Sequence, residues 1–135
     1  MNKRLTVSTE NTWESYVGYS RAIRIGDLVE VARTTAVRGN EVLGGDDPYL
    51  QTVNALQIIE ESLAKLVARL SDVIRTRMFV TDISQWQAIG KAHGEFFGDV
   101  RPVATMVEVK ALIDPRLLVE IEVEAVVDQN GEQEG

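Results

Sequence analysis

Hydrophobic residues recur along this chain at two distinct spacings, and these spacings predict its helices and strands. From Pro48 to about Leu70 they fall three or four residues apart, which predicts an amphipathic helix with a single apolar stripe. Asp47 precedes the stripe and is expected to cap this helix. A second helix is expected to start at Ser84, as its N-cap, and to end at Gly98. Each helix therefore has one face to bury.

Strands are predicted where polar and apolar residues alternate and β-branched residues are frequent. Gly26-Asp27 separates two such runs and is typical of a hairpin turn, while residues 39–47 are expected to form a loop. Two helices with one apolar stripe each favour the same side of a single sheet. We therefore expect an α+β sandwich, a mixed β-sheet with two helices packed on one face. The expected strands cover residues 20–25, 28–35, 73–81, 103–111 and 117–127.

The last strand predicts a charged sheet face as well as a buried one. Glu120, Glu122 and Glu124 share one face, and the apolar residues between them share the other. Carboxylates about 7 Å apart along one strand repel each other unless water or cations intervene. Arg75 and Arg77 have the same period of two, so a cross-strand charge ladder is expected. The glutamate face is either solvated or buried against further copies of the chain.

The composition bounds the size of the domain and the chemistry that it can carry. The chain has 135 residues, and we expect one domain over residues 1–127 and an acidic tail, 128–135, without apolar residues to bury. It has no cysteine, which excludes disulfides and thiol catalysis and agrees with a cytoplasmic location. Its single histidine has no second histidine or cysteine to share a metal, so neither a metal site nor a cofactor is expected.

The net charge limits the partners. At −7, it opposes nucleic-acid binding, which depends on lysine and arginine to neutralise phosphates. No apolar run approaches the roughly 18 to 20 residues that a membrane span needs. We therefore expect neither nucleic acid nor a membrane as a partner.

Four short segments, in this order and at this spacing, carry a family resemblance. They are Arg75–Asp82, Phe96–Gly98, Val107–Val109 and Val119–Glu122. Together they resemble the RidA family (YjgF/YER057c/UK114), whose enzymatic members hydrolyse reactive imines. The resemblance implies a chorismate-mutase-like fold in which three subunits pack their sheets into a central barrel. It also implies a homotrimer that binds a small-molecule metabolite in clefts between subunits.

The resemblance assigns site residues position by position. Tyr19 stands where an aromatic residue lines the family pocket, and Glu120 stands where a carboxylate positions the hydrolytic water. The family's Pro-Ala-Arg-Ser segment, whose arginine holds the substrate carboxylate, corresponds to residues 102–105, so Ala104 replaces that arginine. Thr105 and Met106 follow on the same strand and are expected to line the ligand site.

Two further pocket positions depart from the family. Its pocket asparagine corresponds to Gly90, and a glycine close to the ligand corresponds to Arg33. Arg33 either points into the pocket and supplies the missing positive charge, or turns outward to pair with acidic neighbours, or plugs the cleft. The one histidine, His93, is interpreted as a half-buried packing residue rather than as a ligand.

The missing arginine decides which function is expected. Arginine makes a bidentate, charge-assisted contact to a carboxylate, and neither alanine nor valine can replace it. We therefore expect a metabolite-binding trimer that is not a competent 2-iminoacid deaminase. A divergent imine or enamine hydrolase, in which Glu120 directs water, is the alternative. A ribonuclease ranks last, because the chain is acidic and shows no basic aromatic stripe.

Overall fold

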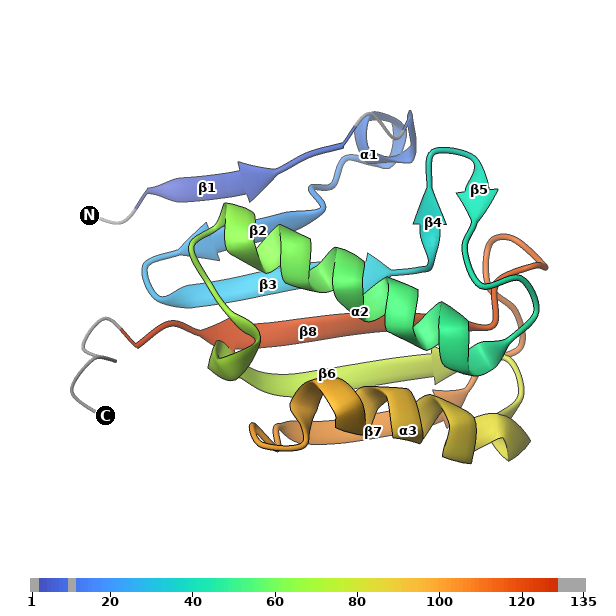
Figure 1. The fold of residues 1–135 in the computed structure, drawn as a ribbon. Helices are drawn as coiled ribbons and strands as arrows, with labels where there is room; N and C mark the ends of the chain where they lie inside the picture. The colour runs from blue at the N-terminus through green and yellow to red at the C-terminus, as the bar shows by residue number, and fades with distance from the viewer. Residues whose placement is uncertain (1–2, 10–11, 129–135) are drawn as a thin grey trace.

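A six-stranded mixed β-sheet forms the centre of the computed structural model, which describes residues 3–9 and 12–128 (Figure 1). The strand order is β1-β2-β3-β8-β6-β7, and all neighbours are antiparallel except β6 and β7, which are parallel. The strands are β1 (Arg4–Val7), β2 (Ala22–Ile25), β3 (Leu28–Thr34), β6 (Val73–Val80), β7 (Val103–Glu108) and β8 (Val119–Val126). The other elements are α1 (Thr12–Val17), β4 (Val37–Arg38), β5 (Glu41–Val42), α2 (Pro48–Lys65), α3 (Trp86–Phe97) and two 3-10 turns, Leu70–Asp72 and Ile83–Gln85.

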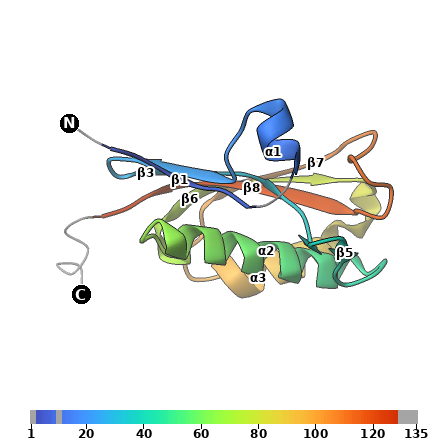
Figure 2. The same ribbon diagram turned by 90° about the horizontal axis from the view of Figure 1, so that it is seen from above.

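Helices α2 and α3 cover the same face of this sheet, whereas α1 lies on the opposite side (Figure 2). The core between helices and sheet contains Leu56 of α2, Phe97 of α3, and Val119 and Ile121 of β8, all of them buried. Burial of each such side chain stabilises the folded state by roughly 1.5–3 kcal/mol. The expected α+β sandwich with two helices on one face of a mixed sheet is confirmed. We call the other side of the sheet the open face.

Each long helix begins at an aspartate that caps it directly or through a short turn. Asp47 caps α2 as predicted, because its Oδ1 accepts bonds from the backbone N–H groups of Tyr49 and Leu50 at 2.9 and 3.2 Å. The prediction that Ser84 caps the second helix was wrong. Asp82 accepts a bond from the N–H of Ser84 at 3.0 Å and starts a 3-10 turn, which then leads into α3.

Helix α2 ends earlier than its apolar stripe suggests. The prediction that it continues to Leu70 was wrong, since Val67 leaves the helix with a φ of 58°. Arg24 of β2 donates from Nη1 to the carbonyl groups of Leu66 and Val67 at 2.8 and 3.3 Å. A side chain from a distant strand therefore satisfies carbonyls that the helix itself leaves unpaired.

Three short elements were not predicted: β1, α1 and the β4–β5 hairpin, which occupies part of the expected loop at 39–47. Helix α1 is held by Glu14, whose buried carboxylate accepts bonds from the N–H and the hydroxyl group of Thr9. From residue 129 on, the expected acidic tail lies outside the described residues. Among the described residues, no helix combines the length and the apolar character needed to cross a membrane.

Candidate functional site

Glu120 lies on β8 at the open face, with a side chain that is only 19% exposed. It is in register with Phe79 of β6. Burial raises the pKa of Glu120, while the charges of Arg33 and Arg21 lower it and that of Glu122 raises it again. A raised pKa makes a carboxyl group a stronger base towards a water molecule.

Arg33 reaches the open face because β3 contains a bulge. The register of β3 against β8 shifts between Val31 and Thr34, so that Thr34 takes the buried position that simple alternation gives to Arg33. Nη1 of Arg33 then lies 3.9 Å from Oε1 of Glu120, and Nε lies 3.4 Å from Oε1 of Glu122. Arg33 therefore pairs with two acidic neighbours, one of which is Glu120 of the expected site.

The ring of Phe79 stacks against the guanidinium group of Arg33. The guanidinium carbon of Arg33 lies 3.9 Å from the centre of the Phe79 ring, a cation–π contact. Sequence reasoning missed Phe79, although it continues the period of two that begins with Arg75 and Arg77. That period was the signal that could have found it.

The expected charge ladder between β6 and β8 forms in part. Arg77 is in register with Glu122, and its Nη1 lies 3.1 Å from Oε2 of that residue. Arg75 is in register with Glu124 but makes no ion pair with a described residue. Glu122 is thus shared between Arg33 and Arg77, and no cation of the described residues lies at ion-pair distance from Glu124.

Tyr19 joins this cluster through Arg21. The guanidinium carbon of Arg21 lies 5.8 Å from the centre of the Tyr19 ring, and Nη2 of Arg21 donates to the carbonyl group of Arg33. The Nε atom of Arg21 is buried and has no hydrogen-bond partner among the described residues. One end of the open face therefore holds two aromatic rings, two guanidinium groups and the carboxyl group of Glu120.

The expected site residues on β7 lie elsewhere. Ala104 and Met106 are in register with Thr76 and Met78, which are buried beneath the helices, so their side chains point to the helical side of the sheet. Thr105 is in register with Arg77 and lies on the open face. Within one chain, the structure does not bring Ala104 or Met106 together with the Glu120 cluster.

His93 and Gly90 of α3 border the same side of β7 as Ala104. Nε2 of His93 lies 2.8 Å from Oγ1 of Thr76, and its ring centre lies 4.8 Å from that of Phe97. Burial lowers the pKa of His93. This agrees with a half-buried packing residue. At Gly90 an added Cβ would meet nothing within 4 Å, so this side of the helix is open.

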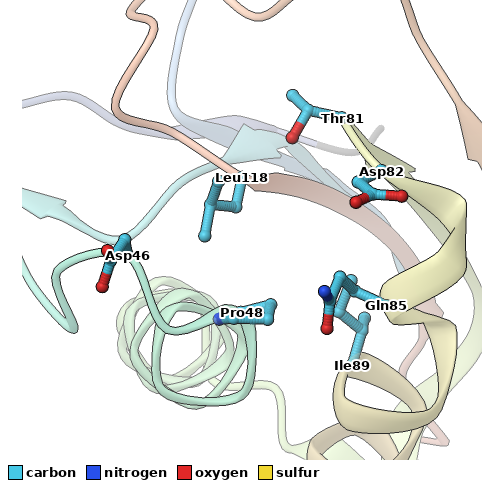
Figure 3. Close-up of a pocket in the computed structure, with 7 residues that line it drawn as sticks. All are labelled: Asp46, Pro48, Thr81, Asp82, Gln85, Ile89 and Leu118. Carbon is cyan, nitrogen blue, oxygen red and sulfur yellow. The ribbon is translucent and has the colours of Figure 1, made fainter.

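A cavity of about 130 Å³ lies apart from all the expected site residues, between the start of α2 and the start of α3 (Figure 3). It is lined by Asp46, Pro48, Thr81, Asp82, Gln85, Ile89 and Leu118. These residues come from three separate stretches of the chain, residues 46–48, 81–89 and 118, so no spacing in the sequence could reveal them. Hydrogen bonds from Ser84 lower the pKa of Asp82, whose carboxylate serves the turn before α3.

The described part of the chain offers no set of side chains that could bind a metal ion. No group of three or more His, Cys, Asp or Glu side chains lies in a position to hold a metal ion there.

Comparisons with known proteins identify the family. The family model described as Endoribonuclease L-PSP matches residues 9–127. An uncharacterised protein of Streptomyces coelicolor is 42% identical over 119 residues, which are 88% of this chain and 89% of that protein. The crystal structure of Rv2704 from Mycobacterium tuberculosis, described as a member of the YjgF/YER057c/UK114 family, is 53% identical with a TM-score of 0.85, over 93% of this chain and all of that one. A member of the Rid protein family from Yersinia pestis is 25% identical with a TM-score of 0.81, over 93% and 100% of the two chains. The chain described here belongs to the YjgF/YER057c/UK114 family, which is also called RidA.

Proposed function

We propose that this protein forms a homotrimer and binds a small metabolite in clefts between its subunits. The observation that carries the proposal is the separation of the expected site residues. Glu120 and Arg33 lie on the open face, whereas Ala104 and Met106 face the helical side of the edge strand β7. One chain cannot present both groups to one ligand. A second copy, with its β7 edge against the open face, would complete the site.

We further propose that this site does not bind a carboxylate group and that its ligand lacks one. The protein would then not be a competent 2-iminoacid deaminase. The methyl group of Ala104 donates no hydrogen bond. Arg33 does not make up for it, because its charge is already engaged by Glu120 and Glu122 at 3.9 and 3.4 Å. A substrate carboxylate would have to compete with both glutamates for one guanidinium group.

An imine-hydrolysis assay tests this proposal. An amino-acid oxidase generates 2-iminoacids in situ, and semicarbazide traps those that survive. We expect the wild type to leave the trapped product unchanged. Ala104→Arg should gain hydrolysis of roughly tenfold or more over the wild type, since a charge-assisted hydrogen bond contributes about 1.5–3 kcal/mol. Ala104→Lys is the matched control, which adds the charge without the bidentate geometry and should gain less.

A divergent imine or enamine hydrolase is the alternative function, and the raised pKa of Glu120 favours it. In this reading Glu120 takes a proton from water as the water oxygen bonds to the imine carbon and the C=N double bond becomes single. The nitrogen, protonated in turn, then leaves as ammonia, and the carbon becomes a carbonyl group. Hydrolysis by the wild type that is lost in Glu120→Gln would overturn the binding proposal and establish the alternative.

A ribonuclease is the third candidate, because the matching family model is described as an endoribonuclease. The net charge of −7 opposes it. RNA affinity that falls steeply with salt would be its signature.

The cytoplasmic location of the protein stays a prediction.

A further inference from the structure

The open face carries a second pair of carboxyl groups, which the proposed ligand site does not use. Glu30 of β3 and Glu124 of β8 lie directly opposite each other in the register of the two strands. On its other side, Glu30 is in register with Ile23 of β2, which offers no charge. Like charges directly opposite each other on neighbouring strands are destabilising. The pair therefore favours a state in which the two carboxyl groups share one proton.

The charged neighbours do not compensate this pair. Arg75 of β6, in register with Glu124, makes no ion pair with a described residue, and Arg77 is engaged by Glu122 at 3.1 Å. Burial and then the hydrogen bond and charge of Glu124 raise the pKa of Glu30 to about 7; the charge of Arg77 lowers it and that of Glu122 raises it. Already in a single chain, Glu30 changes its charge near neutral pH.

Exposed apolar side chains lie next to the pair on the same face, at one end of the strands. Leu28 is in register with Ile25 and Val126, and these three residues are 41–43% exposed in the single chain. In the proposed trimer, another copy covers this face. Covering it removes water from the carboxyl pair as well as from the apolar side chains, and removing water favours the protonated form.

We infer that assembly takes up one proton for each Glu30–Glu124 pair, so that the trimer dissociates more readily as the pH rises above neutrality. This inference rests on the proposed trimer. The sign follows from the two states: the assembled pair holds its proton more tightly than the single chain. The stabilisation of the trimer is therefore complete below a pH of about 7 and is lost as the pH rises through the higher pKa of Glu30 in the trimer.

Sedimentation equilibrium between pH 6.5 and 9 tests the inference. Each pair that takes up a proton changes the assembly constant by up to about tenfold per pH unit, so three pairs give up to about a thousandfold. We expect the wild type to dissociate with rising pH in this way. Glu30→Gln carries a permanent donor to Glu124 and should assemble with little pH dependence. Glu41→Gln, the same change on the β4–β5 hairpin, is the matched control and should behave as the wild type.

The outcomes separate this inference from the proposed function. A trimer whose assembly has the same pH dependence in the wild type and in Glu30→Gln would overturn the inference and leave the proposed trimer intact. A chain that stays monomeric at every pH, with a native circular dichroism spectrum, would overturn both. Proton uptake on assembly, measured by titration calorimetry in buffers of different ionisation enthalpy, gives a second readout. Equal uptake in the wild type and in Glu30→Gln would also overturn the inference.

Discussion

Arg33 engages three neighbours with one guanidinium group. It stacks on Phe79 and pairs with Glu120 and Glu122, while its own side chain remains 53% exposed. Ion pairs that are this exposed contribute little to stability, about 0–1 kcal/mol. The larger effect of Arg33 is electrostatic, because it is the strongest influence that lowers the pKa of Glu120.

Arg33→Ala is therefore expected to raise the pKa of Glu120 further above its ordinary value. The free energy of unfolding should fall by only about 1 kcal/mol, since the lost contacts are half exposed. NMR titration of the ¹³C-labelled glutamate carboxyl groups measures the pKa, and urea unfolding measures the stability. Arg33→Lys keeps the positive charge, so the pKa of Glu120 should stay close to its wild-type value. A Glu120 titration that is the same in Arg33→Ala and the wild type would contradict this prediction.

The residue scale also shows what the sequence could and could not predict. Alternation along β8 was enough to separate Glu120, Glu122 and Glu124 from the core, and the Arg77–Glu122 pair is confirmed. Alternation alone could not place Arg33 on the open face, because the bulge depends on how β3 pairs with β8, about 90 positions later in the chain. Strict alternation would have buried Arg33.

At the scale of elements, the ends of α2 have different origins. Its start is determined by two adjacent residues, Asp47 and Pro48, and was predicted. Its end depends on Arg24, which reaches the last carbonyl groups from another strand, and was therefore missed. The short elements β1, α1 and the β4–β5 hairpin were missed because none is long enough to show a period.

Asp47→Ala tests the local origin of the helix start. The loss of the two bonds to Tyr49 and Leu50 should lower the free energy of unfolding by about 1 kcal/mol, within a range of roughly 0.5–2. Asp46→Ala is the matched control: it removes the same side chain one position earlier, where it lines the cavity rather than the helix cap. Urea unfolding should separate the two variants. Equal losses in both would mean that the cap contributes nothing specific.

At the scale of the whole molecule, the two apolar stripes predicted the arrangement of layers, whereas the sides of the sheet to which the expected site residues point depend on strand pairing. The register of β6 with β7 and with β8 decides that Ala104 and Glu120 point to opposite sides. The cavity between α2 and α3 arises in the same way, from segments that only the fold brings together.

Subunit mixing tests whether the site is shared. Chains with both Ala104→Arg and Glu120→Gln should be inactive in the imine assay, and so should wild-type chains. Trimers obtained by co-expressing the two, with different affinity tags, should be active, because some clefts combine the introduced arginine with the intact Glu120. Activity in the double variant alone, or none in mixed trimers when Ala104→Arg alone is active, would contradict a shared cleft.

The position of β7 at the end of the sheet has a consequence for the life of the protein in a cell. Only β6 pairs with β7, so the backbone donors and acceptors along its outer side have no partner strand among the described residues. Its six residues contain no lysine or proline, the residues that commonly guard such edges. A chain that lingers alone therefore offers a template on which another strand can add, and cross-β aggregation competes with assembly. In the proposed trimer, contact of this edge with another copy would also remove that template.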